Sequence, residues 1–193
     1  MSSSSRSFVA RAAAAASLLS TWAVLASAAA STATPAHVLH YIADARPAGS
    51  GRLTWFGLHV YDAQLYVPRG FDASRPEARP LALELTYARK LTGLAIAERS
   101  HDEIARLAPV ATEAQRARWL DDMKALFPDV ESGERLAGIY RPNAPTRFYL
   151  NGRLLGEVAD PDFGRAFFAI WLDPRTSAPQ LRSSLLRGEP KTQ

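Results

Sequence analysis

The chain has 193 residues, of which 47% are hydrophobic and 22% are charged, and its formal net charge is +4 at pH 7. This composition is typical of a folded globular protein, and the basic residues do not cluster as they do on nucleic-acid-binding surfaces. The sequence contains no cysteine, which excludes disulfides, a thiolate nucleophile and cysteine-ligated metal centres.

The first thirty residues have the pattern of a cleavable secretory signal peptide. Arg6 and Arg11 stand in a leader without acidic residues, an apolar run covers residues 12–26, and small residues at 26–30 offer cleavage sites. The run is shorter than the roughly 20 apolar residues of a membrane span; an uncleaved amino-terminal anchor is the alternative. Removing the two arginines from 23 basic residues leaves 21 against 19 acidic ones, a mature net charge of +2. We therefore predict a periplasmic or secreted protein with no stable membrane insertion after cleavage.

The stretch 52–67 organises the predicted fold. It follows an amino-terminal segment, residues 31–48, in which residues 37–43 are predicted to form a short strand. Nearly every residue of 52–67 is aromatic, aliphatic or β-branched, types that favour strands. At roughly 3.3 Å per residue the stretch is too long for one typical strand, so we expect Gly57 to bend or turn the chain between two consecutive strands. Both faces are rich in apolar groups, which indicates a central position in a sheet covered on two sides.

Strands and helices are both predicted downstream. Four more strands are expected at residues 81–88, 134–141, 146–150 and 153–158. Asn151-Gly152 joins the last two, and this is the strongest short hairpin signal. Helices are expected at residues 92–107, 112–127, 161–172 and 177–187, with Asp160 capping the third. In the first helix, Leu94 is expected to face inward and Glu103 to face solvent.

The order of these elements predicts an α+β domain over residues 49–187. Hairpin-linked strands with helices inserted in the middle and at the end favour an antiparallel sheet with a helical layer on one face. Residues 188–193 are expected to be a disordered tail.

No enzyme motif is present. The chain lacks a P-loop and the G-x-S-x-G pattern, and its four histidines are scattered, so we predict neither a metal site nor a cofactor. What remains is a set of polar residues on otherwise apolar strands: Arg52, Thr54, His59, Tyr61, Gln64, Tyr87, Arg89, Arg147 and Tyr149. An arginine beside tyrosine hydroxyls in a dry cleft is a good anion receptor. In the alternative interpretation, the arginines lie in water at strand ends and the tyrosines are core rings.

Three segments resemble the chalcone isomerase-like family, specifically its exported bacterial members. They are Gly51-Arg52 with the strand that ends at residues 60–67, residues 83–87 leading into Leu91-Thr92-Gly93, and residues 149–152 with the helix near 163–172 and Ser177-Ala178-Pro179. Together these segments span roughly residues 49–187. The resemblance implies an open-faced β-sandwich with a ligand cleft between the sheet and the helices.

The resemblance also implies roles for individual residues. In the plant enzymes an arginine at the start of this strand steadies the substrate phenolate, and in the fatty-acid-binding branch the matching arginine holds a carboxylate with a tyrosine; Arg52 is the matching position. The position of the catalytic tyrosine is Ile96, that of the catalytic lysine is Tyr87, and the threonine of the second strand falls at about Tyr61. Chalcone cyclisation by the plant arrangement is therefore not expected.

Three functional hypotheses follow from these residues. The first is a non-catalytic binder of a small amphipathic acid of the fatty-acid type, with Arg52, Tyr61, Tyr87 and His59 as ligand-binding candidates. The second is an isomerase or intramolecular lyase for an unknown enone or phenolic substrate, which requires Arg52, His59 and Tyr61 to converge. The third is a cell-envelope domain that binds a protein partner, which predicts a collapsed cleft and an exposed apolar patch of several hundred Å². None of them involves nucleic acid.

Overall fold

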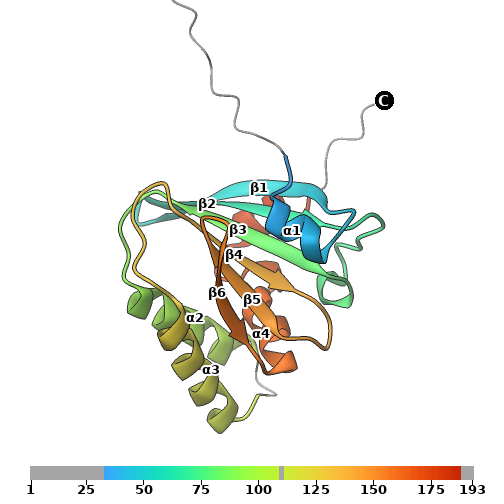
Figure 1. Ribbon diagram of the computed structural model, residues 1–193. Helices are drawn as coiled ribbons and strands as arrows, with labels where there is room; N and C mark the ends of the chain where they lie inside the picture. Colours follow the sequence, from blue (N-terminus) through green and yellow to red (C-terminus); the bar gives the residue numbers. More distant parts are fainter. Residues whose placement is uncertain (1–32, 109–110, 188–193) are drawn as a thin grey trace, which may run out of the picture. The chain divides into compact units, whose positions relative to one another are not determined.

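The strands follow one another across a single antiparallel sheet. The computed structural model describes residues 33–108 and 111–187, and in them six strands pair in the order β1-β2-β3-β4-β5-β6 (Figure 1). Their bounds are β1 Arg46–Trp55, β2 Leu58–Val67, β3 Leu81–Tyr87, β4 Arg135–Tyr140, β5 Thr146–Leu150 and β6 Arg153–Val158. Each strand therefore hydrogen-bonds to its neighbour in sequence, and β1 and β6 are the two edges of the sheet.

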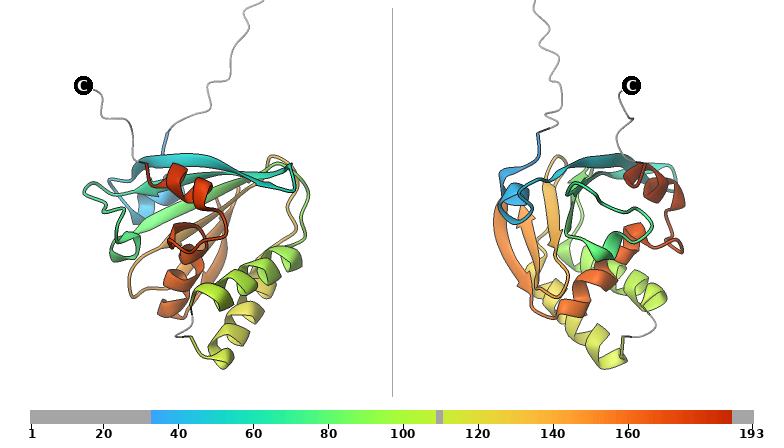
Figure 2. Two further views of the ribbon diagram at one scale, coloured as in Figure 1. Left: turned by 180° about the vertical axis from the view of Figure 1, so that it is seen from behind. Right: turned by 90° about the vertical axis from the view of Figure 1, so that its right-hand side faces the viewer.

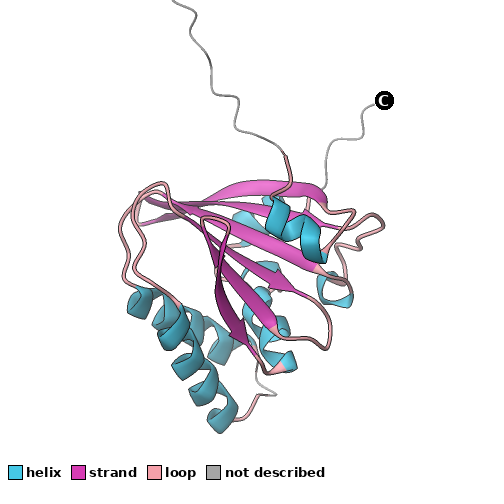
Figure 3. Cartoon of the chain, viewed as in Figure 1, coloured by secondary structure: helices cyan, strands magenta, loops and turns pink. Residues whose placement is uncertain are grey.

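Helices cover the two faces of the sheet unequally, as Figures 2 and 3 show. The main core joins one face of the sheet, here called the inner face, to four helices: α2 Gly93–Leu107, α3 Glu113–Leu126, α4 Pro161–Leu172 and α5 Pro179–Leu185. The opposite, outer face carries the short helix α1 Ala36–Tyr41 over a smaller apolar cluster. A single 3₁₀ turn, Pro76–Ala78, interrupts the β2–β3 connection. The predicted α+β architecture with an antiparallel sheet and a helical layer is confirmed.

Side-chain caps fix where the helices begin. Thr92 accepts a hydrogen bond from the Ala95 amide at the start of α2, and Thr112 and Gln115 form a reciprocal capping box at the start of α3. Asp160 caps α4 as expected. Its second carboxylate oxygen also accepts a hydrogen bond of 2.9 Å from Trp119 Nε1, which ties the start of α4 to α3.

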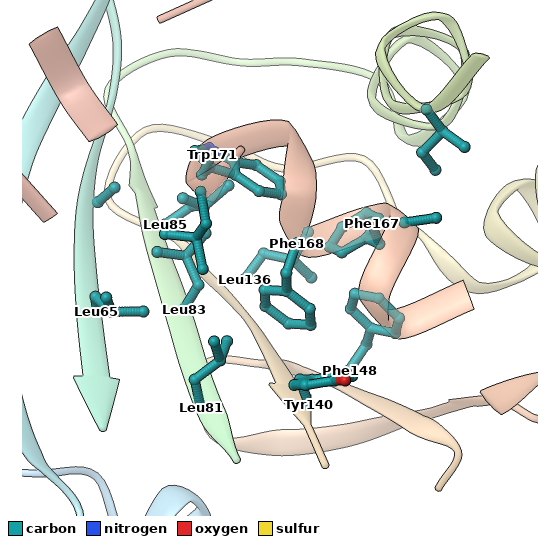
Figure 4. Packing of buried hydrophobic residues seen from close by; sticks show 14 of the residues in the cluster. Leu65, Leu81, Leu83, Leu85, Leu136, Tyr140, Phe148, Phe167, Phe168 and Trp171 are labelled. Carbon is teal, nitrogen blue, oxygen red and sulfur yellow. The ribbon is translucent and has the colours of Figure 1, made fainter. Parts of the chain in front are cut away.

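Aromatic rings fill the space between the sheet and α4. Phe148 of β5 contacts Phe167 edge-to-face, with ring centroids 5.2 Å apart (Figure 4). The ring centroid of Phe127 lies 4.9 Å from that of Phe148. Gly164 lets α4 lie close to the sheet, because a Cβ atom there would stand 2.5 Å from Thr146 Oγ1. Side chains therefore fill the space between α4 and the carboxyl-terminal half of the sheet, whereas the space under β1–β3 is not completely filled.

Two predictions about the amino-terminal part of the domain are wrong. Residues 37–43 are not a strand; Pro35 begins helix α1, and Val38 and Ile42, four residues apart, are both buried on one side of it. The first half of the stretch 52–67 is also not central, because it belongs to the edge strand β1; the second half is β2, between β1 and β3, and the chain turns at Gly57 as predicted. The predicted signal peptide, residues 1–30, and the predicted tail, residues 188–193, lie outside the described residues. No helix within 33–108 and 111–187 has both the length and the apolar character to cross a membrane.

Truncating Phe148 should be strongly destabilising. The Phe148→Ala variant leaves a void among three other rings, and we expect it to lower the free energy of unfolding by about 3–5 kcal/mol in urea denaturation. The matched control is Leu154→Ala, at an exposed position of β6, which we expect to change it by less than about 0.5 kcal/mol. Equal effects of the two substitutions would contradict this core assignment.

Candidate functional site

A cavity of about 640 Å³ lies between the inner face of β1–β3 and helices α2, α4 and α5. Cavities that hold small molecules in proteins measure roughly 300–1,000 Å³ and have mostly apolar walls with a few polar groups. The apolar wall comprises Leu53, Val60, Leu85, Leu91, Ala95, Ile96, Leu136, Phe167, Ile170, Ala178 and Leu181. The exposed lining residues Trp55, Arg89 and Arg99 mark its mouth.

Two tyrosines on adjacent strands face the cavity. Tyr61 and Tyr87 are paired across β2 and β3, are both buried, and have ring centroids 5.9 Å apart. Trp171 Nε1 donates a 2.9 Å hydrogen bond to the Tyr61 hydroxyl, so the proton of that hydroxyl remains free for another acceptor. Within the described residues no group hydrogen-bonds to the Tyr87 hydroxyl.

Both tyrosines are neutral hydrogen-bond donors at physiological pH. Burial raises the pKa of Tyr61 to about 12, although the hydrogen bond from Trp171 acts in the opposite direction. Burial raises the pKa of Tyr87 as well, with a further contribution from Tyr61. An anionic ligand in the cavity would therefore meet hydroxyl protons and no phenolate charge.

A buried carboxylate, Glu103, stands at the α2 wall with its side chain 6% exposed. Its Oε1 accepts hydrogen bonds from Arg99 Nη2 at 2.5 Å and Ser177 Oγ at 2.8 Å, and its Oε2 accepts one from Arg106 Nη2 at 2.5 Å. Burial opposes ionisation, but the hydrogen bonds from Arg106 and Ser177 and the charges of the two arginines outweigh it, so the pKa of Glu103 is lowered. Sequence reasoning missed this group and placed it in solvent. The signal that could have found it is its spacing of four from the apolar Leu107, because residues four apart lie on the same face of a helix.

Arg99 borders the cavity and is held in place by two contacts. Its side chain is 54% exposed, and its Cζ atom lies 5.2 Å from the Trp55 ring centroid. One of its nitrogens is held by Glu103, which fixes the guanidinium between the α2 wall and the β1–β2 hairpin. The expectation that Leu94 faces inward is wrong: its side chain is exposed, and Arg99 and Ile96 line the cavity instead.

Arg52 borders the cavity, but its guanidinium lies on the outer face of the sheet. Arg52 pairs with Asp62 in the β1–β2 register, and directly opposed residues of antiparallel strands project to the same face. Tyr61, the neighbour of Asp62, projects to the inner face. Arg52 Nε donates a 2.9 Å hydrogen bond to Asp62 Oδ1, and the Arg52 side chain is 59% exposed.

A β-bulge places His59 on the outer face too. Leu53 pairs with Tyr61 and Thr54 pairs with His59, so Val60 is an extra residue in β2. Val60 and Tyr61 consequently both reach the cavity, whereas His59 Nε2 lies 3.3 Å from Asp62 Oδ2. The structure thus brings Tyr61 and Tyr87 together in the cavity. It brings Arg52, at the border of the cavity, and His59 together beside Asp62 on the outer face of the sheet. Among the described residues no group of three or more His, Asp or Glu side chains could hold a metal ion.

The comparisons with known proteins agree with this fold. A family model described as chalcone isomerase-like matches residues 48–187. The crystal structure of a fatty-acid binding protein from Arabidopsis thaliana superimposes with a TM-score of 0.58 and 13% sequence identity, covering 74% of this chain and 87% of that one. At this identity the structural likeness concerns the fold alone. A search of curated protein sequences finds no significant match.

Replacing Glu103 by Gln should show how much the buried cluster contributes to the stability of the fold. We expect the Glu103→Gln variant to lose about 1–3 kcal/mol of unfolding free energy near neutral pH, because charge-assisted hydrogen bonds to both arginines are weakened. A carboxyl group whose pKa is lowered by folding stabilises the protein above its ordinary value of 4.5 and loses that effect as the pH falls through the folded-state pKa. The gap between the wild type and the variant in urea denaturation should therefore narrow below pH 4.5. A gap that does not change with pH would contradict this role.

Proposed function

Because the chain belongs to the chalcone isomerase-like family, we propose that it is a non-catalytic binder of a small amphipathic acid of the fatty-acid type. The observation that carries the proposal is a mostly apolar cavity of about 640 Å³ that two buried tyrosines line and three arginines, Arg52, Arg89 and Arg99, border. The name of the structural relative, a fatty-acid binding protein, supports the same ligand class.

In this proposal Arg99 holds the carboxylate of the ligand. The cluster of Arg99, Glu103 and Arg106 contains two guanidinium groups and one carboxylate, so its net charge is positive. A guanidinium carries five N–H donors, and Glu103 engages one nitrogen of Arg99, which leaves donors for a ligand on a group that is already oriented. The Tyr61 and Tyr87 hydroxyls supply additional neutral donors.

The tail of the ligand occupies the apolar wall. Each buried methylene contributes about 0.8 kcal/mol, so affinity should rise with tail length until the cavity is full. The arginine then decides the orientation of the ligand and the tail provides most of the affinity. Small-molecule sites commonly have mostly apolar walls and a few polar groups that orient the ligand.

The family resemblance implies that Arg52 holds the carboxylate of the ligand. In this proposal Arg99 holds it instead. Arg52 borders the cavity, but its Nε is hydrogen-bonded to Asp62 on the outer face, which directs the guanidinium away from the inner face. The isomerase alternative required Arg52, His59 and Tyr61 to meet at one point. Because His59 and Arg52 surround Asp62 while Tyr61 faces the cavity, we favour binding over catalysis.

The ligand proposal predicts different results for two arginines. We expect Arg99→Met to weaken binding of a saturated fatty acid at least tenfold, because one charge-assisted contact is worth about 1.5–3 kcal/mol. The matched control, Arg52→Met, should change the affinity by less than about twofold, as expected for an exposed surface ion pair. Affinity is measured by displacement of a fluorescent fatty acid, with the fatty alcohol of the same length as a neutral probe whose binding Arg99→Met should leave nearly unchanged.

Other results would redirect the assignment. If only Arg52→Met lowers the affinity for the fatty acid, then Arg52 holds the carboxylate. Equal weakening of the acid and the alcohol by Arg99→Met would mean that this arginine supports the cavity without recognising the charge. If no fatty acid and no fatty alcohol binds, the proposed ligand-binding function is wrong.

We also propose that the protein is exported to the periplasm or beyond, as in the exported bacterial branch of the family. The positively charged leader, the apolar run and the small residues within residues 1–30 support export. Intact-mass measurement of the protein from a periplasmic fraction should give a chain that starts within residues 29–31, after cleavage near Ala28 to Ala30. A mass that still includes Met1 would contradict cleavage.

A further inference from the structure

The β1–β2 turn carries an aromatic residue where its geometry favours asparagine. Phe56 and Gly57 form a two-residue turn with φ angles of 47° and 77°, and Asn151 and Gly152 form the β5–β6 turn with φ angles of 51° and 82°. Such turns strongly prefer Asn-Gly, because a bulky side chain at positive φ is sterically strained. The same chain therefore uses the favoured residue in one turn and a disfavoured one in the other. Backbone strain of this kind indicates a functional role for the Phe56 side chain.

The side chains around this turn are exposed and apolar. Phe56 is 91% exposed, and its neighbours Trp55 and Leu58 are both more than half exposed. We call residues 55–58 the hairpin tip; it lies at one end of the sheet (Figure 1). Trp55 also lines the cavity, so the tip is continuous with the cavity mouth.

Basic groups flank the hairpin tip. The Ala88 amide donates to the Val60 carbonyl at 2.9 Å, which places the exposed Arg89 at the same end of the sheet. Arg99 lies over the Trp55 ring. No acidic side chain within residues 33–108 and 111–187 forms an ion pair with Arg89. These cations complement phosphate groups more readily than an apolar protein surface.

We propose that the hairpin tip inserts into the interface of a phospholipid bilayer, with Arg89 and Arg99 contacting lipid phosphates. Aromatic and leucine side chains beside arginine are the composition of segments that lie at the boundary between headgroups and acyl chains. A protein partner is less well matched, because a specific interface buries about 800 Å² on each side, far more than three partly exposed side chains provide. Docking in this way sets the cavity mouth against the bilayer, and it does not depend on the cavity holding any ligand.

The decisive variant is Phe56→Asn, which gives this turn the residue found at position 151. The purified mature chain, without residues 1–30 and without added ligand, is sedimented with vesicles of phosphatidylcholine containing phosphatidylglycerol, so that the apolar run of the leader cannot contribute to binding. We expect Phe56→Asn to bind at least tenfold more weakly than the wild type, while its melting temperature is unchanged or higher because asparagine relieves the strain. Leu154→Asn is the matched control; Leu154 is also exposed, on the opposite edge strand, and its replacement should leave vesicle binding unchanged.

Two further variants test the hairpin tip and its cations independently of Phe56. Leu58→Ser should also weaken vesicle binding, and Arg89→Ala should weaken it about fivefold with anionic lipid, an effect that added salt reduces. A wild type that does not bind vesicles, or tip variants that bind as well as the wild type, would overturn the proposal. Loss of binding to the same extent in Leu154→Asn would overturn it as well.

Discussion

One extra residue in β2 decides which polar groups the cavity receives. Side chains alternate strictly along a strand, so an unbroken β2 would place His59 and Tyr61 on one face and Val60 on the other. The bulge at Val60 breaks this alternation. Tyr61 and Val60 both face the helices, and His59 joins Asp62 and Arg52 on the outer face. The chemistry of the inner face, with hydroxyls and no imidazole, follows from this single irregularity.

A charged cluster supports the other side of the cavity. Glu103 receives hydrogen bonds from α2 and from Ser177 ahead of α5, and Arg106 donates to the Arg175 carbonyl at 2.7 Å. The cluster thereby links α2 to the segment between α4 and α5. Apolar side chains of the same size would tend to close the cavity, whereas a buried carboxylate held by two arginines requires a fixed geometry. The same cluster gives the cavity wall its positive charge, so the support of the fold and the proposed recognition of an acid rest on the same residues.

The cavity and the hairpin tip form one continuous feature. Trp55 belongs to both, and Arg99 joins them through its contact with that ring. An amphipathic acid has low solubility as a monomer in water, and a binder whose mouth rests on a bilayer could exchange such a ligand without exposing its tail. The family match over residues 48–187 covers the sheet, the cavity and the tip, but not helix α1 on the outer face.

The sequence by itself determined the elements whose signals are local. Asn151-Gly152 predicted its hairpin, Asp160-Pro161 predicted the start of α4, and the order of strands and helices predicted the α+β class, because turn and capping preferences act within a few residues. The tertiary structure decided what depends on partners far along the chain. Residues 36–41, most of which were predicted to be a strand, form a helix whose apolar side chains cover the outer face of the sheet. Glu103 became buried because Ser177, 74 residues away, and two arginines satisfy its oxygens. The side of the sheet on which Arg52 lies was set by its register with Asp62 and β2, a pairing that no local pattern encodes.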